Sequence, residues 1–568
     1  MINKVEQIAY FSMEIGLDAH LPTYSGGLGV LAGDTIKSFA DLGVPVTAIT
    51  LLSEEGFFHQ EIDQSGWQLE IPVKWDKNEF LQHINEKVKI FIEGREVYVG
   101  AWKRTIIGTT GKEVSVIFLD TNLPENSEWD RNLTKRLYGG DNWYRLCQEL
   151  ILGIAGVRML RKLGFNFAGE KNVIHKYHMN EGHASFLTLE LMNESKKSHL
   201  NENENFHLQN VRKRCVFTTH TPIPAGHDSF KIEDVRRAIE PNLFNTDSSF
   251  IINNKFSMTH LALHFSSHIN GVAKKHKEVS QKMFPGYSID SITNGVHSPT
   301  WTGPSFKKLF DKYIPGWRRD SFTLRYSLNI PSNEIWDAHM NQKKNLIDFV
   351  NKNTNKGFEY NVLTIGFARR VASYKRINFL LKDIERLKSI NKKGKIQIIL
   401  AGKAHPNDIQ GKELIRETIN TINSLNDEIK IAFLPNYEMW LGQLMISGVD
   451  LWLNTPMRPH EASGTSGMKA AHNGVLNFSI LDGWWIEGCV EGITGWSIGP
   501  KANSCEDFVD EKLEINDLYY KLENKIIPLY YKNREGWIKM MLHSISHNAS
   551  FFNTQRMVTQ YITNCYFL

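Results

Sequence analysis

Short apolar runs alternate with amphipathic stretches along most of this chain. Residues 8–13 and 44–50 are rich in aromatic and β-branched side chains, so we expect a buried strand at each. The proline of the second run lies near its start, where a strand tolerates one. Between them, residues 34–43 place apolar side chains at helical spacing and end on a glycine. This strand–helix–strand order is the unit of a parallel, doubly wound sheet.

The second half of the chain repeats this order. Residues 361–367, 396–402 and 449–454 predict three further strands, and a basic loop after the first leads to a helix predicted from about Arg376. An Asn294-Gly295 turn signal precedes these units.

A chain of 568 residues is too long for one core. We therefore expect an α/β protein with two Rossmann-like, doubly wound domains, residues 1–295 and 296–568, facing a central cleft. The carboxyl ends of the strands border the cleft in this architecture and hold its ligands. The last helix, residues 554–566, is expected to pack back on the first domain.

Composition narrows the functional class. The chain has 66 Lys and Arg against 62 Asp and Glu, a balance without the basic stripe of a nucleic-acid-binding protein. No apolar run has the length of a signal peptide core or a membrane span. We expect a cytoplasmic protein with neither a nucleic-acid nor a membrane partner. Widely spaced cysteines predict reduced thiols and no metal site, and they are Cys147, Cys215, Cys489, Cys505 and Cys565.

The most informative segment is a loop of small residues followed by a lysine. Residues 461–469 read EASGTSGMK, and a helix is predicted to begin within them. Backbone N–H groups and the helix dipole at such a start attract an anion, and Lys469 is close enough to attach its carrier. Pyridoxal phosphate, a phosphorylated aldehyde, meets both conditions. The alternative is an ordinary Gly/Ser turn before a helix.

Three further segments follow predicted strands. Residues 25–29, SGGLG, either bring the backbone close to an anion or form a tight turn. Residues 369–376, RRVASYKR, place four cations at the carboxyl end of a strand, where they suit a multiply charged phosphate, although such a run is often a solvated surface. His220, in TTHTP, is either a structural histidine or a sugar contact.

Taken together and in this order, these segments resemble the α-glucan phosphorylases, the pyridoxal-phosphate glycosyltransferases that include glycogen and maltodextrin phosphorylases. The resemblance covers nearly the whole chain and is closest to the compact bacterial and archaeal branch. The motifs that carry it are GGLG (26–29), LYGGDN (137–142), HMNEGH (178–183), THTP (219–222), ITNGVH (292–297), RRVASYKR (369–376), EASGTSGMKAAHNG (461–474) and LDGWW (481–485). The chain lacks the N-terminal regulatory extension of animal members, so phosphorylation control of that kind is not expected.

The resemblance implies a GT-B type architecture and a hexosyltransferase activity. Inorganic phosphate would cleave the terminal α-1,4-linked glucose of glycogen, starch or maltodextrin and give α-D-glucose 1-phosphate with retained configuration. The cofactor's 5′-phosphate would relay a proton to the substrate phosphate. Two phosphates with second pKa values of about 6 can share a proton near neutral pH, provided that cations offset their repulsion. Members are often dimers, so a homodimer is one expected state.

The resemblance also assigns roles to residues. Lys469 would carry the cofactor covalently, Arg370 and Lys375 would hold the substrate phosphate, and Glu461 would accept hydrogen bonds from sugar hydroxyls or cap the following loop. The other residues expected at the cofactor are Arg369, Gly27, Tyr437, Gly464, Thr465 and Ser466. The residues expected at the substrates are Gly26, Gly27, Leu28, Asp141, Asn142, His220, Asn294, Tyr374, Ser463 and Gly464.

Some positions leave alternatives open. Glu438 stands where animal members carry a basic residue, and Trp484 and Trp485 either stack on a ligand or belong to the core. The role of His460, which precedes Glu461, is also open. Two other functions remain at this stage. A nucleotide-sugar transferase of the glycogen-synthase type would share the fold without needing Lys469, and an idle glucan-binding protein would bind oligosaccharide without turnover.

Overall fold

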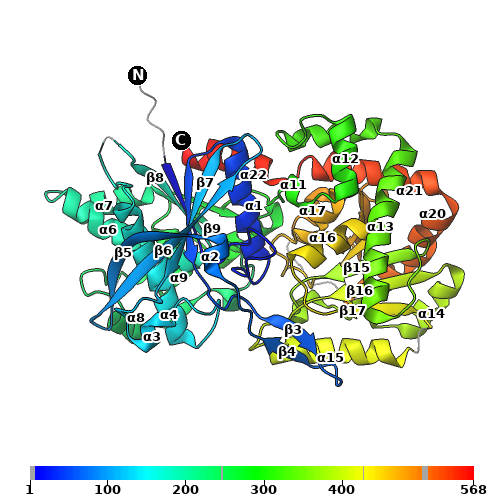
Figure 1. The fold of residues 1–568 in the computed structure, drawn as a ribbon, viewed down its shortest axis with the longest axis horizontal. Coiled ribbons are helices and arrows are strands. Elements are labelled where there is room, and N and C mark those ends of the chain that lie inside the picture. The colour runs from blue at the N-terminus through cyan, green and yellow to red at the C-terminus, as the bar shows by residue number, and fades with distance from the viewer. Residues whose placement is uncertain (1–6, 170, 245–246, 426–427, 502–509, 568) are drawn as a thin grey trace.

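Two α/β halves lie side by side, each built around a sheet (Figure 1). The computed structural model describes residues 7–169, 171–244, 247–425, 428–501 and 510–567, and Cys505 lies outside them. The remaining cysteines have free thiols in the described part of the chain.

The first half contains a nine-stranded sheet. Its strands, in spatial order, are β14 (Asp290–Ser291), β13 (His268–Gly271), β9 (Cys215–Thr218), β8 (Ile174–Asn180), β1 (Gln7–Ser12), β2 (Val46–Leu51), β7 (Glu113–Asp120), β6 (Arg95–Ile107) and β5 (Gln82–Ile92). Neighbours from β14 to β7 pair in parallel, whereas β6 and β5 run antiparallel at one edge. Tyr10 of β1 is in register with Ala48 of β2 and His178 of β8.

The second half contains a six-stranded parallel sheet. Its strands, in spatial order, are β17 (Lys430–Leu434), β16 (Ile396–Ala401), β15 (Leu363–Ala368), β18 (Leu451–Asn454), β19 (Leu476–Ile480) and β20 (Gly495–Ile498). Each predicted strand is confirmed to within two residues at its ends. The predicted fold class, two doubly wound α/β units of GT-B type, is confirmed as well.

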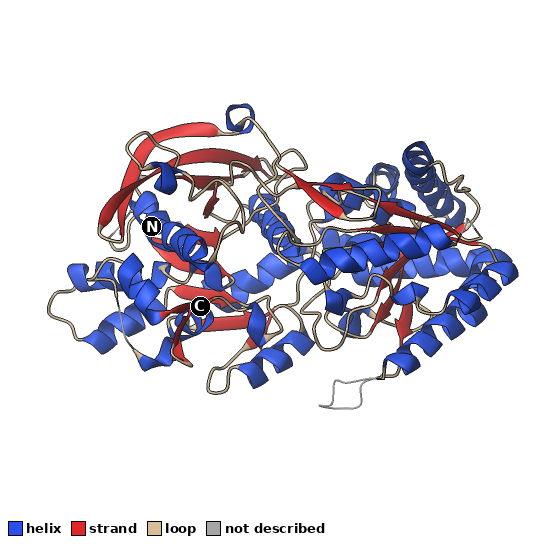
Figure 2. Ribbon diagram, turned by 90° about the horizontal axis from the view of Figure 1, so that it is seen from below, coloured by secondary structure: helices blue, strands red, loops and turns tan. Residues whose placement is uncertain are grey.

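Helices cover the strands of both halves (Figure 2). The longer ones are α1 (Gly27–Leu42), α4 (Asn142–Leu150), α6 (Leu187–Ser198), α7 (Glu204–Arg212), α10 (Lys274–Met283), α12 (Pro304–Tyr313), α13 (Ser332–Thr354), α14 (Ile384–Lys393), α15 (Ile409–Ser424), α16 (Met439–Gly448), α19 (Glu511–Lys521), α21 (Arg534–His543) and α22 (Thr554–Tyr561). Two short helices matter for the site, α11 (Ser298–Trp301) and α17 (Ser466–Ala471).

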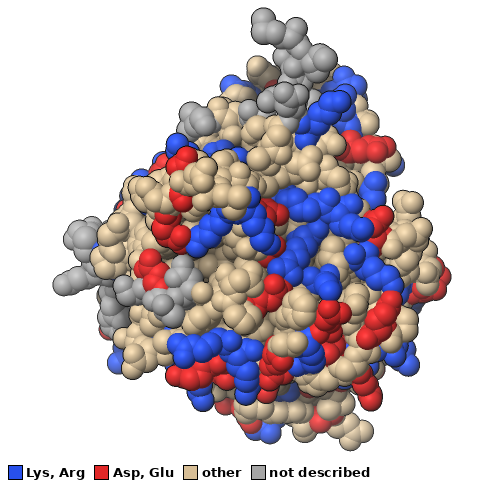
Figure 3. All heavy atoms as spheres, turned by 90° about the vertical axis from the view of Figure 1, so that its left-hand side faces the viewer, with Lys and Arg blue, Asp and Glu red and all other residues tan. Residues whose placement is uncertain are grey.

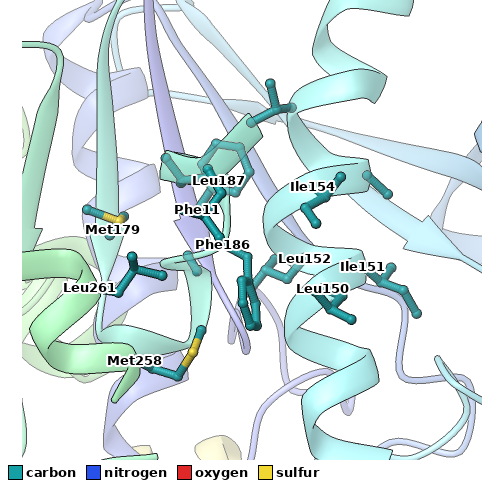
Figure 4. Packing of buried hydrophobic residues seen from close by; sticks show 14 of the residues in the cluster. Phe11, Leu150, Ile151, Leu152, Ile154, Met179, Phe186, Leu187, Met258 and Leu261 are labelled. Carbon is teal, nitrogen blue, oxygen red and sulfur yellow. The ribbon is translucent and has the colours of Figure 1, made fainter. Parts of the chain in front are cut away.

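The core of the first half fixes the strand ends that reach the site. Phe11 of β1 and Met179 of β8 belong to one buried cluster with Leu150 and Ile154, which lie on the helix formed by α4 and its π-helical continuation (Ile151–Ala155) (Figure 4). These side chains are almost fully buried, and each such burial contributes about 1.5–3 kcal/mol to folding. The chain that follows β1 therefore leaves the sheet from a fixed position.

Two helix starts differ from the sequence prediction. Helix α1 begins at Gly27 rather than near Asp34, so the glycines expected in a loop form its first turn. The helix predicted from Arg376 is wrong: Arg376 adopts a left-handed backbone conformation, and its guanidinium donates to the carbonyl oxygens of Thr455 and Pro456. Helix α14 starts only at Ile384, where the Asp383 carboxylate caps it.

Two segments tie the halves together. The hairpin of β3 (His59–Ile62) and β4 (Gln68–Ile71) reaches from the first half to α15, and Gln60 donates to the Gly402 carbonyl at 2.9 Å (Figure 1). At the other end of the chain α22 packs on α1, with the Ser38 and Thr554 hydroxyls 2.6 Å apart. The loops at the ends of the central strands therefore lie between two contacts that join the halves.

Charge is mixed over the surface. Lys and Arg lie beside Asp and Glu on the face of the first half that Figure 3 presents. Within the described ranges no helix combines the length and the apolar character needed to cross a bilayer.

Candidate functional site

Lys469 lies on α17 in a buried environment. Its side chain is 8% exposed, and its Nζ lies 3.6 Å from the centroid of the Trp301 indole. Burial lowers the pKa of Lys469 to about 8, with Asp34 opposing the shift and Lys37 adding to it. Roughly one such amine in ten is neutral at pH 7, and a neutral amine is the form that bonds to a carbonyl carbon.

The loop before this helix is rigid and contains an unused polar atom. Gly464 has φ of +82°, a left-handed conformation that favours glycine. The Ser463 carbonyl accepts the Trp484 N–H at 2.9 Å, and the Trp452 indole donates to the Ser466 hydroxyl at 3.1 Å. The Ser463 hydroxyl is buried and has no hydrogen-bond partner within the described ranges. Thr465 accepts the Lys469 N–H at 3.2 Å, which starts the helix as predicted.

Two of the predicted phosphate ligands meet on Glu461. Lys375 Nζ lies 2.8 Å from both carboxylate oxygens, and Arg369 pairs with the same carboxylate and with Asn454. Although desolvation opposes its charge, Arg369 and Lys375 lower the pKa of Glu461 to about 2. Arg369 also has a buried Nε without a partner among the described residues. The cluster is therefore built to hold negative charge at the ends of β15 and β18.

Arg370, the next residue, is exposed. The surrounding protein opposes its charge, but Tyr374, and then Glu14 and Tyr138, more than compensate and raise the pKa of Arg370. Because Glu14 and Tyr138 belong to the first half, this guanidinium from the second half lies within electrostatic range of the first.

The glycine segment of the first half is anchored on Glu14. The Glu14 carboxylate accepts the N–H groups of Ser25 at 2.6 Å and Gly26 at 3.1 Å, and it also accepts the Tyr138 hydroxyl at 3.0 Å. A Cβ atom added to Gly26 or Gly27 would meet no atom within 4 Å. The N–H of Gly26 is thus engaged, while exposed Gly27 and half-buried Leu28 border open space at the start of a 16-residue helix.

The predicted sugar contacts lie in other segments of the first half. His220, after β9, binds Asn180 Oδ1 through Nε2 at 2.6 Å, and burial lowers the pKa of its imidazole to about 4. Asn294 is buried with an unpartnered Oδ1 among the described residues. Asp141 and Asn142 are exposed, and Asp141 caps α4 through the Tyr144 N–H at 2.9 Å.

In the part of the chain that the structure describes, no hydrogen bond or ion pair joins these sugar-contact residues to the Glu461 cluster. Tyr437 is half-buried beside Gly442, and burial raises the pKa of its phenol to about 12.

The sequence patterns assign no role to three residues that lie at the site. Asp482 accepts the Glu461 N–H at 2.9 Å, and burial, with Glu461 nearby, raises the pKa of Asp482 to about 7. Glu14 and Trp301 are also at the site; only the position of Glu14 just past a strand end could have indicated it.

The structure also locates the residues whose roles the sequence leaves undecided. Trp484 and Trp485 are buried against each other and Phe552, which makes them core residues. His460 contacts the Tyr374 ring edge-on at 6.0 Å. Glu438 lies 3.6 Å from the buried Lys403 ammonium, so a cation from another loop stands beside it.

Comparison with known proteins gives a consistent result. A sequence model of the carbohydrate phosphorylase family matches residues 232–492. The maltodextrin phosphorylase of Thermococcus litoralis is 40% identical, over 99% of this chain and 70% of that protein. The glycogen phosphorylase of Mycobacterium tuberculosis is 35% identical over 98% of this chain and 70% of its own length, and that of Aquifex aeolicus is 34% identical over 98% and 86%. The similarity extends over nearly the whole chain.

Proposed function

The chain belongs to the carbohydrate phosphorylase family, and we propose that it catalyses phosphorolysis of the terminal α-1,4-linked glucose of glycogen or maltodextrin. The product would be α-D-glucose 1-phosphate with retained configuration. One observation carries this proposal: residues 461–469 hold both a buried amine, Lys469, and the carboxylate that gathers Arg369 and Lys375. An amine for a carbonyl cofactor and cations for phosphate thus belong to one segment.

The residues present fit pyridoxal phosphate. Lys469 would bind its carbonyl carbon, and the 464–466 turn would lie against its phosphate together with Arg369, Tyr437 and Gly27. The buried, unpartnered atoms of the described chain at Ser463 Oγ and Arg369 Nε are available to ligands there. When bound, this cofactor supplies a phosphate group that exchanges a proton near neutral pH.

The cations would make the phosphorolytic step feasible. Two phosphate charges roughly 4 Å apart repel by about 4 kcal/mol at an effective dielectric of about 20, so fixed positive charge must offset them. Arg370 and Lys375 would bind the substrate phosphate, with the Gly27 N–H as a further donor. Lys375 has three donors and can hold a phosphate oxygen while keeping Glu461.

The substrate phosphate would then protonate the leaving glycosidic oxygen and stabilise the positive charge that develops on the glucosyl group. It occupies the role that the second carboxylate plays in a retaining hydrolase. Glu461, Tyr374, His220, Asn294, Asp141 and Asn142 would orient the sugar. The low pKa of Glu461 keeps it an acceptor and excludes it as the general acid at neutral pH.

The proposal is tested by the release of glucose 1-phosphate from maltoheptaose. We expect release only when inorganic phosphate is present and a loss of at least a hundredfold in kcat/KM for Arg370→Ala, in line with the removal of a charged transition-state contact. Glucosyl transfer from a nucleotide sugar without any phosphorolysis would refute it and favour a synthase-type transferase. A cytoplasmic homodimer is the accompanying proposal, which cell fractionation and light scattering would test.

A further inference from the structure

The indole of Trp301 connects Lys469 to helix α1. On its face, the ring centroid lies 3.6 Å from Lys469 Nζ. At its edge, Trp301 Nε1 donates to Asp34 Oδ2 at 2.6 Å, and the same oxygen accepts the His297 N–H at 3.1 Å. The amine and the carboxylate are thus held on one rigid ring, although their residues come from opposite ends of the chain.

Asp34 has an oxygen that this arrangement does not use. Its side chain is 1% exposed, and Oδ1 has no hydrogen-bond partner among the described residues. Leaving a buried carboxylate oxygen unpartnered is costly unless positive charge lies nearby. A cation near Asp34 would offset that cost.

A second charge stands one turn further along α1. Lys37 Nζ donates to the Thr300 hydroxyl at 3.2 Å, and Thr300 precedes Trp301 on α11. Helix α1 thus places the Asp34 carboxylate and the Lys37 ammonium against α11, the short helix that carries Trp301.

Other charges around Lys469 are few. Four elements that pack on α17 bring no titratable side chain to Lys469: α11, α16, β18 and β19. His472, which follows α17 directly, is neutral at pH 7 because burial lowers its pKa to about 4, and it binds the Ser298 hydroxyl. His547 on the adjoining π-helical turn (Ser544–Ala549) is exposed, and His297 pairs with Asp41 at 2.9 Å.

We propose that Asp34 and Lys37 are opposed positioning residues that set how readily the Lys469 amine gives up its proton, Asp34 favouring the charged amine and Lys37 the neutral one. The use of that amine, condensation with a carbonyl group with loss of one water, rests on the proposed function. The electrostatics agree with the geometry: after burial, Asp34 raises the pKa of Lys469 and Lys37 lowers it. Neither residue needs to contact substrate.

Competitive acetylation measures this directly. The full-length protein, freed of any aldehyde cofactor, is treated with acetic anhydride between pH 6 and pH 9, and acetylated Lys469 is quantified by peptide mass spectrometry. Exposed Lys525 serves as the internal reference. Asp34→Asn keeps an oxygen for the Trp301 donor and removes the charge, while Lys37→Met removes the opposing charge.

The two variants should move in opposite directions. We expect Asp34→Asn to lower the pH midpoint of Lys469 reactivity by about one unit, which makes Lys469 roughly fivefold more reactive at pH 7. Lys37→Met should raise the midpoint and make Lys469 about threefold less reactive at that pH. A loss of packing alone would shift both variants in the same direction.

Unchanged midpoints, or shifts of the same sign, would overturn the proposal. If Asp34→Asn does not fold, Lys37→Met decides alone, since an unchanged or lowered midpoint in that variant contradicts the opposed roles. Because acetylation needs neither pyridoxal phosphate nor glucan, its outcome is separate from that of the phosphorolysis assay.

Discussion

Lys375 Nζ lies 2.8 Å from each carboxylate oxygen of Glu461, and both side chains are buried. This contact joins the loop after β15 to the loop before α17, the two segments that the proposed reaction needs together. With Arg369 on the same carboxylate, two cations depend on one anion.

Glu461→Gln should expose that dependence. Removing one partner of a buried ion pair leaves uncompensated charge, so we expect the free energy of unfolding to fall by about 3 kcal/mol in phosphate-free buffer. Inorganic phosphate should then raise the Tm of the variant more than that of the wild type, because it supplies the missing anion.

The matched control is Glu334→Gln, which breaks a solvent-accessible pair with Lys312 and should lower the free energy of unfolding far less than Glu461→Gln does. Equal phosphate responses in Glu461→Gln and wild type would contradict an anion site between Arg369 and Lys375.

Gly27→Ala should separate folding from activity. An added Cβ meets no atom within 4 Å, and alanine is the better residue in a helix by up to about 1 kcal/mol. We therefore expect an unchanged or slightly raised Tm together with a several-fold higher KM for phosphate, because the methyl group enters the space beside the proposed phosphate donor.

Gly29→Ala is the contrasting variant. Its Cβ would lie 2.6 Å from Glu14 Oε2 and 2.7 Å from Tyr24 Cβ, so this substitution should lower the Tm. A Gly27→Ala enzyme with wild-type KM for phosphate would remove Gly27 from the site.

Asp482 should make stability depend on pH. Its pKa is about 7 in the folded protein against 3.8 in an ordinary aspartate, so the folded state binds the extra proton between these values. The free energy of unfolding therefore falls as pH rises through this window, by up to about 1.4 kcal/mol per pH unit. Asp482→Asn carries no such proton, and urea denaturation from pH 4 to pH 8 should give a difference from wild type that changes with pH. A constant difference would show that Asp482 does not titrate there.

The sequence predicts the strands well and the helix starts less well, for physical reasons. Buried parallel strands such as residues 363–368 are continuous apolar runs, which local pattern captures. The start of α14 is set by tertiary contacts, because Arg376 binds carbonyls from the loop after β18 and leaves the helical conformation. At α1, glycines that favour turns conceal a helix start that the Glu14 carboxylate stabilises.

The sequence likewise predicts one part of the candidate site and misses another. Lys469 and the basic loop are visible in the chain because their chemistry is concentrated in a few neighbouring residues. The partners that set their charge, Trp301 and Asp34 for Lys469, come from distant segments and are brought together only by folding. No local spacing indicates those contacts.

Borohydride reduction followed by peptide mass spectrometry tests the central claim most directly. Full-length protein incubated with pyridoxal phosphate should yield a Lys469 peptide carrying one pyridoxyl phosphate group, and phosphate-dependent release of glucose 1-phosphate should rise with the labelled fraction. Lys469→Ala should lose both the label and the activity. A protein that degrades maltoheptaose with phosphate while Lys469 remains unlabelled, or whose Lys469→Ala variant keeps full activity, would contradict the account.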